Sequence, residues 1–396
     1  MKMVYLDNSA TTRQYDEVTD LMYRLAKEQF GNPSSLHTLG FESSTMLKQA
    51  RRDCEELFYG NGSVIFTSGG TESDNMALVS TARKMRRRGN RIVTTKVEHP
   101  AVLETCRRLK DSGFDICYLD VDVDGYVEPQ VVRAALDERT ILVSIMTVNN
   151  EVGTIEPVLQ SYRIVKEFNK THGTEIVFHT DAVQAFGKIS FEEAAFDLIS
   201  VSGHKIHGPK GIGFLYMNKD LKLPAYITGG GQEMGYRSST ENTTGIAGLA
   251  LASKMAYSDH VNKMRRIADV NEYLRKGLFA ELKDIEINGP ESLGFSLLDA
   301  GKRCPSVLNI SFHGTRAEVL LHTLEQDEIY ISTGSACASN HTGDSHVLQA
   351  MSMDHKEIEG AVRFSFSEFN TIDEMDFVID RTKTAVNRFR KLGTFR

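Results

Sequence analysis

At residues 196–217 the chain reads Phe196-Asp-Leu-Ile-Ser-Val-Ser-Gly-His-Lys-Ile-His-Gly-Pro-Lys-Gly-Ile-Gly-Phe-Leu-Tyr-Met217. Both ends of this stretch are apolar runs of strand length, so they predict two strands joined by a Ser/Gly/His-rich loop that contains Lys205. Partial burial in such a loop would lower the pKa of the lysine amine and favour Schiff-base formation with a carbonyl compound. A surface lysine beside a Gly-Pro turn is the alternative, and this stretch alone does not decide between the two.

Apolar runs of strand length alternate with helical stretches through the first half of the chain. They are Ser63–Thr67, Arg91–Thr95, Ile116–Leu119, Thr140–Met146 and Glu175–His179. Together with the two strands around Lys205 they predict an α/β fold with a mainly parallel, seven-stranded sheet flanked by helices. Ligands of such a sheet bind at the carboxyl ends of its strands.

The pattern changes near residue 255, where residues 254–282 are charged and helix-like and a mixed segment follows to Arg396. We therefore expect a large domain at residues 15–255. A smaller α+β domain would comprise residues 1–14 and 256–396. A chain of 396 residues, 41% hydrophobic, is long enough for two such domains.

Composition excludes several function classes. A formal net charge of −7 argues against a dedicated nucleic-acid-binding protein. No segment approaches the length of a membrane span and the N-terminus has no secretion signal, so the cytoplasm is the expected compartment. The five cysteines are too scattered for a disulfide framework or a zinc site, and His204 and His207 have no further ligand nearby, so we expect no metal.

Polar groups follow two of the predicted strands at the positions that a phosphorylated ring would need. Gly70 and Thr71 lead into a helix whose free N–H groups can bind a phosphate. Asp181 follows another strand and could hold a protonated ring nitrogen. A helix cap and a turn carboxylate, respectively, are the alternatives.

Two further strand ends carry Asn150 and His99. Asn150 could form a hydrogen bond with a ring hydroxyl, although Asn is also common in turns. His99 could stack its imidazole over a planar ring, although its place before Pro100 also suits a helix cap. The four strand ends together match the requirements of pyridoxal phosphate, a phosphorylated pyridine aldehyde.

Two residues of the C-terminal part are candidates for other roles. Cys337 stands among small residues in a segment without apolar periodicity, which would leave its thiol exposed as a nucleophile or sulfur carrier. Arg363 is one guanidinium in an otherwise apolar strand, where it could bind a carboxylate through two hydrogen bonds. A structural ion pair is the alternative for Arg363.

Six motifs, in this order, resemble those of the NifS/IscS-type cysteine desulfurases, which belong to the pyridoxal-phosphate-dependent class V aminotransferase group. The motifs are Tyr5-Leu-Asp-Asn-Ser-Ala-Thr-Thr12, Phe30-Gly-Asn-Pro-Ser34, Phe66-Thr-Ser-Gly-Gly-Thr-Glu-Ser-Asp-Asn75, Val148-Asn-Asn-Glu-Val-Gly153, Ser202-Gly-His-Lys205 and Gly334-Ser-Ala-Cys337. The resemblance implies fold type I of the pyridoxal-phosphate-dependent transferases and extends over nearly the whole chain. Ser239 and His207 depart from the glycine and tyrosine that many members have.

The resemblance also implies a role for each candidate. Lys205 would hold the cofactor as a Schiff base and His99 would stack over it. Its other contacts would be Gly70, Thr71, Asn150, Asp181, Gln184, Ser202, Gly203 and His204. A threonine of the partner subunit completes the phosphate site in this family, and Thr240 matches it, which implies a homodimer.

The implied reaction converts L-cysteine to L-alanine. Lys205 would remove the Cα proton, Arg363 and Asn150 would contact the substrate, and Cys337 would take the sulfur as a persulfide. The persulfide would pass to an acceptor such as an iron–sulfur scaffold or a tRNA-thiolation enzyme. A selenocysteine lyase is the nearest alternative, and a cofactor-free binding scaffold is an alternative from another class.

Overall fold

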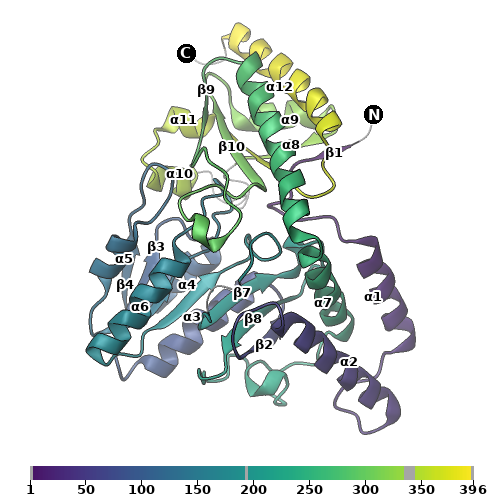
Figure 1. The fold of residues 1–396 in the computed structure, drawn as a ribbon, viewed down its shortest axis with the longest axis vertical. Helices are drawn as coiled ribbons and strands as arrows, with labels where there is room; N and C mark the ends of the chain where they lie inside the picture. Colours follow the sequence, from purple (N-terminus) through teal and green to yellow (C-terminus); the bar gives the residue numbers. More distant parts are fainter. Residues whose placement is uncertain (1–2, 192–194, 334–343, 394–396) are drawn as a thin grey trace.

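A seven-stranded sheet forms the lower half of the molecule in Figure 1. The computed structural model describes residues 3–191, 195–333 and 344–393. The strand order is β2-β8-β7-β6-β5-β3-β4, and β8 is antiparallel to both neighbours whereas the other pairs are parallel. The strands are β2 (Gly62–Thr67), β3 (Arg91–Thr95), β4 (Asp115–Leu119), β5 (Thr140–Ser144), β6 (Val177–Asp181), β7 (Leu198–Ser202) and β8 (Gly213–Asn218). The predicted mainly parallel α/β sheet is confirmed.

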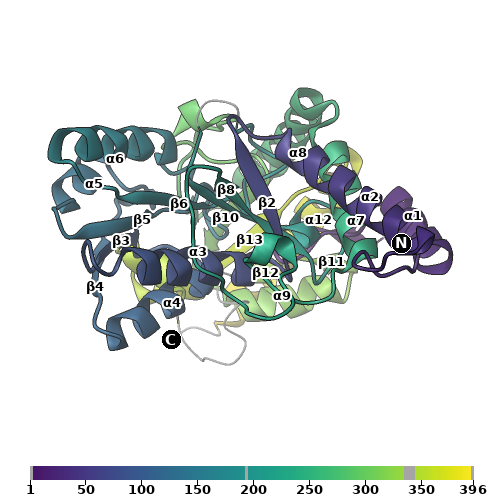
Figure 2. The ribbon, with the colours of Figure 1, turned by 90° about the horizontal axis from the view of Figure 1, so that it is seen from below.

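Helices cover both faces of this sheet. Successive side chains of a strand point to opposite faces, so Leu142 and Leu198 pack in one apolar cluster whereas Val143 and Ile199 pack in another. Figure 2 shows α3 and α4 on one side and α5 and α6 on the other. The helices are α3 (Gly70–Met85), α4 (Pro100–Asp111), α5 (Pro129–Ala135), α6 (Val158–His172) and, beside them, α1 (Asp16–Glu28), α2 (Thr38–Glu55) and α7 (Thr243–Tyr257).

A smaller, antiparallel sheet with the order β12-β13-β10-β9 lies in the upper half of Figure 1. Its strands are β9 (Ile285–Ile287), β10 (Val307–Phe312), β12 (Ser332–Thr333) and β13 (Ala361–Ser365). The helices around it are α8 (His260–Glu281), α9 (Ala317–Glu325), α10 (His346–Ala350), α11 (His355–Glu359) and α12 (Ile372–Leu392). One apolar cluster contains residues of both halves, such as Phe178 and Phe364, so the two sheets share a continuous core.

The N-terminal segment joins the two halves. Strand β1 (Val4–Tyr5) pairs in parallel with β11 (Ile329–Tyr330), and the Ser365 N–H donates to the Leu6 carbonyl at 2.7 Å. The chain then turns toward the large sheet, where the Thr12 N–H donates to the His204 carbonyl at 2.9 Å. This segment therefore contacts the small sheet and the loop that follows β7.

Several elements differ from their predicted bounds. Strand β5 ends at Ser144 rather than Met146, and β7 and β8 each begin two residues later than predicted. Strand β6 begins and ends two residues later than predicted, because its pairing with β7 continues through Asp181 opposite Ser200. The charged stretch at residues 254–282 contains the end of α7 and the whole of α8, separated at Asp259, whose φ of +52° lies in the left-handed region. The helical prediction was right in kind and missed the break.

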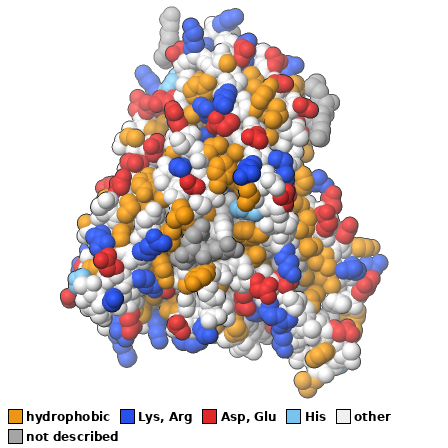
Figure 3. Space-filling model, in the orientation of Figure 1, with side chains coloured by type: hydrophobic (Ala, Val, Ile, Leu, Met, Phe, Trp, Pro, Cys, Tyr) orange, Lys and Arg blue, Asp and Glu red, His pale blue; other side chains and the backbone are white. Residues whose placement is uncertain are grey.

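Acidic and basic side chains are interspersed over the face drawn in Figure 3. Within the described ranges, no helix combines the length and the apolar character that crossing a bilayer requires. The described part of the chain also contains no group of three His, Cys, Asp or Glu side chains placed to hold a metal ion.

Candidate active site

A cavity of about 260 Å³ lies at the carboxyl ends of the parallel strands. Its lining includes most of the residues that the sequence singled out, and they come from five different strand ends. These residues are Gly70, Thr71, His99, Asn150, Asp181, Gln184, Ser202, His204 and Lys205. The sequence had given no individual role to the other lining residues, although the first four lie within the quoted motifs: Ser9, Ala10, Asp74, Val148, Met146 and Val183.

Lys205 ends a short 3₁₀ turn (Gly203–Lys205) that directly follows β7. Its amine donates hydrogen bonds to the carbonyl oxygens of Ala10, at 2.8 Å, and of Ser9. Backbone carbonyls from the N-terminal segment therefore position the amine at the cavity. The motif at residues 5–12 indicated that this segment matters, but a contact through backbone atoms leaves no residue type to recognise.

The N-terminus of α3 faces the cavity through Gly70 and Thr71. The first N–H groups of a helix have no partner within the helix and attract anions. Glycine is needed at position 70, because a Cβ there would lie 2.6 Å from Cγ2 of Val183. A phosphate group fits this end of the cavity.

Asp181 provides a buried carboxylate. Its Oδ1 accepts from the Val183 N–H at 2.8 Å, and burial raises its pKa to about 6, although this hydrogen bond and the charge of Lys205 oppose the rise. Asp74, which also lines the cavity, is fully buried, and burial and the charge of Asp181 hold its pKa well above the usual value. Burial and the charge of Asp181 thus favour the protonated form of Asp74, and Asp181 is the carboxylate of this pair that suits a protonated ring nitrogen.

His99 both caps α4 and lines the cavity. Its Nδ1 accepts from the Ala101 N–H at 3.1 Å, and burial, with the charges of Lys205 and His346, lowers its pKa to about 4. The imidazole is thus neutral at physiological pH. Because Nδ1 accepts, Nε2 carries the hydrogen.

Arg363 lies on β13 with 2% of its surface exposed. It donates from Nη1 to the carbonyl of Asn150 and from Nη2 to Oδ1 of Asp7, each at 2.9 Å. The ion pair that the sequence left open as an alternative is therefore present. Arg363 does not line the cavity, but it contacts the backbone of Asn150, which does.

Besides Arg363, two predicted site residues in the described part of the chain, Gly203 and Thr240, do not line this cavity. Thr240 is exposed in the segment before α7. Gly203 packs against the backbone of the loop that follows it, where a Cβ on Gly203 would be 3.0 Å from the carbonyl oxygen of Pro209. Cys337 lies outside the described residues. The other four cysteines are buried or partly buried, and burial raises the pKa values of Cys54 and Cys106 to about 12.

The cavity combines an amine, a buried carboxylate, a helix N-terminus without side-chain obstruction and a neutral imidazole. These groups are complementary to the aldehyde, the ring nitrogen, the phosphate and the ring face of pyridoxal phosphate, so the residues fit this cofactor.

Known proteins resemble the whole chain. The family model described as "Aminotransferase class-V" matches residues 4–378. Cysteine desulfurase IscS of Dictyoglomus turgidum is 38% identical over 396 residues, covering 99% of this chain and 97% of the relative. The IscS of Clostridium botulinum strain Hall is 39% identical over 395 residues, covering 99% and 96%.

Solved structures agree with these relatives. A NifS-like protein superposes with a TM-score of 0.87 and 36% identity, covering 98% of this chain and 100% of the other. The NifS-like protein of Rickettsia africae gives a TM-score of 0.82 and 26% identity, with the same coverage. The chain therefore belongs to the NifS/IscS-type cysteine desulfurases of the pyridoxal-phosphate-dependent class-V aminotransferase family.

Proposed function

We propose that this cysteine desulfurase converts L-cysteine to L-alanine and carries the removed sulfur as a persulfide on Cys337 to an acceptor protein. The observation that supports the first step is the cavity, where the Lys205 amine, the Asp181 carboxylate and the N-terminus of α3 converge. This arrangement provides an attachment point, a partner for a ring nitrogen and an anion site within one cavity.

Nine of the lining residues would hold the cofactor. Gly70 and Thr71 bind its phosphate, assisted by Ser202 and His204. The remaining contacts are Asp181 at the ring nitrogen, Asn150 and Gln184 at the ring edge, His99 over the ring face and Lys205 at the aldehyde. Bound there, pyridoxal phosphate supplies an electron sink that acidifies the Cα–H of an amino acid and weakens its Cβ–S bond.

The chain's own side chains perform the proton transfer and the substrate binding. The Lys205 amine accepts the Cα proton, because it lies at the cavity and the Ser9 and Ala10 carbonyls orient it. Arg363, with Asn150, binds the substrate carboxylate, since a guanidinium can form two parallel hydrogen bonds with it. Neutral His99 can donate from Nε2 toward the cavity.

Cys337 takes the sulfur. Its thiolate forms an S–S bond with the sulfur of L-cysteine as the Cβ–S bond breaks, and the electron pair of that bond stays with the carbon fragment. Protonation of its Cβ and Cα then gives L-alanine. The choice of Cys337 is supported by the burial of Cys54 and Cys106, which raises the pKa of both thiols and disfavours a thiolate there. The residues next to Cys337 in the sequence are small, which leaves room around the thiol of a nucleophile.

A homodimer would complete the phosphate site. Thr240 is exposed and does not line the cavity of its own chain, so a second subunit could contribute it. In this proposal residues 15–255 form the cofactor-binding domain, and residues 1–14 with 256–396 form a smaller domain that carries Cys337. The acceptor would be an iron–sulfur scaffold or a tRNA-thiolation enzyme.

The test is the yield of alanine from the purified, cofactor-loaded protein with L-cysteine and a reducing thiol. We expect the native chain to form alanine, the Cys337→Ser variant to form none, and Cys117→Ser, a partly buried cysteine, to match the native chain. Equal alanine from native and Cys337→Ser protein would exclude Cys337 as the sulfur acceptor. If the native chain releases alanine from selenocysteine alone, the proposed substrate is wrong.

A further inference from the structure

Lys188 is a partly buried lysine that the proposed reaction does not use. It follows Gln184 by four residues in a helical turn after β6, in which the Lys188 N–H donates to the Ala185 carbonyl at 2.9 Å. Gly187 adopts a φ of +78° in this turn, and the Lys188 amine reaches Oε1 of Gln184. The turn is held by close packing at Gly187, where a Cβ would be 2.9 Å from Cβ of Ala256. Gln184 and Lys188 therefore have fixed relative positions.

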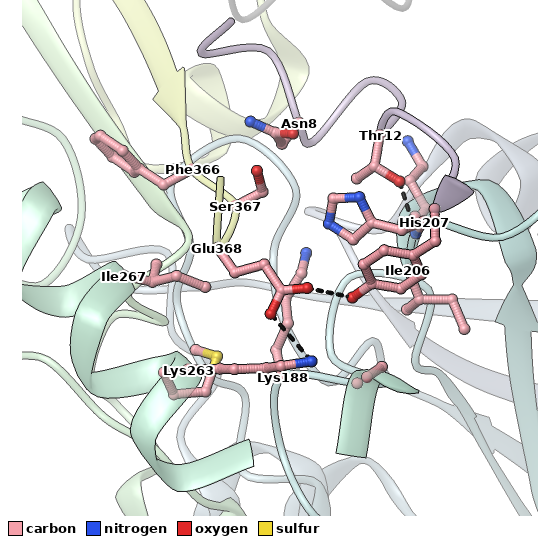
Figure 4. A pocket seen from close by; sticks show the side chains of 15 residues that line it. Asn8, Thr12, Lys188, Ile206, His207, Lys263, Ile267, Phe366, Ser367 and Glu368 are labelled. Carbon is pink, nitrogen blue, oxygen red and sulfur yellow. Dashed lines mark hydrogen bonds and ion pairs between the residues drawn. The ribbon is translucent and has the colours of Figure 1, made fainter. Parts of the chain in front are cut away.

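Lys188 lines a second, smaller cavity of about 40 Å³, which Lys205 also lines (Figure 4). The carboxylate in this lining, Glu368, is already engaged by the Tyr15 hydroxyl at 2.5 Å and by Lys263 at 3.0 Å. Among the described residues, the hydrogen-bond partner of the Lys188 amine is Oε1 of Gln184, at 3.2 Å.

The surroundings of Lys188 are rich in cations. Burial lowers the pKa of its amine, and the charge of Arg363 lowers it further, against an opposing effect of Cys304. The titratable groups around Lys188 are Tyr15, Lys205, His207, His260, Lys263, Cys304, Arg363 and Glu368.

The partners of Gln184 determine which way its amide points. A lysine amine can only donate, so the atom it contacts must be the amide oxygen. The other partner is the Ser9 carbonyl, which can only accept, and Nε2 donates to it at 2.9 Å. Both contacts require the same orientation, and one N–H of Gln184 remains for a ligand. The Ser9 carbonyl also accepts from Lys205, so Lys188, Gln184, Ser9 and Lys205 form one connected chain.

We propose that Lys188 is a positioning residue, which holds Gln184 as a hydrogen-bond donor toward the cofactor and keeps a positive charge behind it. The proposal rests on the proposed cofactor position, in which Gln184 contacts the ring edge. A positive charge favours the deprotonated form of nearby groups. A unit charge at about 10 Å in a medium of effective dielectric constant about 20 shifts a pKa by about one unit.

The test uses the cofactor-loaded protein without substrate. Its visible absorbance changes with pH as the linkage between Lys205 and pyridoxal phosphate loses a proton. The midpoint of this change is the pKa of the linkage, which depends on the charges nearby. In Lys188→Met, which keeps the length and loses the charge and the donors, we expect the midpoint to rise by about one pH unit. Lys188→Arg keeps the charge and the hydrogen-bond donors and should retain the native midpoint. Lys166→Met, which removes a lysine paired with Asp197 outside both cavities, is the matched control.

Gln184→Glu gives a second test that leaves Lys188 in place. A glutamate can accept from Lys188 but has no N–H for Ser9 or a ligand, so the midpoint should rise and the dissociation constant of pyridoxal phosphate should increase. The proposal is overturned if Lys188→Met keeps the native midpoint, if Lys188→Arg shifts like Lys188→Met, or if Gln184→Glu behaves as the native protein. None of these measurements uses L-cysteine, so their outcome is independent of the role of Cys337.

Discussion

Replacement of Glu98 by glutamine should stabilise the protein at neutral pH and have little effect in acid. Glu98 precedes His99 and is fully buried. Its Oε1 accepts from the Thr95 hydroxyl and from the Met146 N–H, each at 2.9 Å, whereas Oε2 has no partner among the described residues. Burial raises its pKa from 4.5 to about 8 against the opposing effect of both hydrogen bonds, while the charge of Asp181 contributes to the rise.

The sign and size of the effect follow from proton linkage. Because the folded protein holds this proton more tightly than the unfolded chain, stability is lost as the pH rises from 4.5 to about 8. Each pH unit in this window costs about 1.4 kcal/mol, which amounts to roughly 3 kcal/mol at pH 7. Glutamine keeps an acceptor at the position of Oε1 and cannot ionise, so the Glu98→Gln variant avoids this cost.

The assay is the free energy of unfolding of cofactor-free native and Glu98→Gln protein, measured by urea titration between pH 4.5 and 8.5. The difference between the two removes the titration of every other group and should rise with pH by about 1.4 kcal/mol per unit. Glu104→Gln, at an exposed position on α4, controls for the loss of one negative charge. A difference that is constant with pH would refute the reasoning that burial keeps Glu98 protonated.

Three further results are expected at the cofactor and substrate contacts. Gly70→Ala should weaken pyridoxal phosphate binding, because the new Cβ would clash with Val183. Adding Val183→Ala to this variant should restore the dissociation constant, and a double variant that still binds weakly would contradict steric obstruction. Arg363→Lys should raise KM for L-cysteine about tenfold and leave cofactor affinity unchanged, because an ammonium cannot form the two parallel hydrogen bonds; an unchanged KM would exclude carboxylate binding. Cofactor affinity should fall as the pH is lowered through about 6, where Asp181 takes up a proton. If the same fall occurs in Asp181→Asn, another titrating group causes it.

Local sequence patterns were sufficient to predict the large sheet and its strand ends. Strand-length apolar runs and the turn residues after them identify Gly70, Asn150 and Asp181 as neighbours in space, because the ends of parallel strands meet at one edge. The same local rules predicted the loop of Lys205 after β7. The arrangement of these residues therefore follows from properties that each segment carries by itself.

Contacts between distant segments could not be predicted in this way. The carbonyls of Ser9 and Ala10 that hold Lys205 belong to residues nearly 200 positions earlier, and a carbonyl is common to every residue type. The burial of Glu98 could not be predicted either, because a charged residue before His-Pro is typical of an exposed turn. The left-handed backbone at Asp259 that separates α7 from α8 interrupts a stretch whose composition favours one continuous helix.

The short turn at residues 7–10 fixes the separation of two contacts, one with Arg363 and one with Lys205. Asp7 contacts Arg363, Ser9 and Ala10 contact Lys205, and the Ala10 N–H closes the turn on the Asp7 carbonyl at 3.1 Å. In the proposed function Arg363 binds the substrate carboxylate and the Lys205 amine accepts the proton from the substrate Cα, so the turn sets the distance between these two groups. Inserting one residue into it would separate the two contacts without altering any catalytic group, and the sizes of acceptable substrates would change with it.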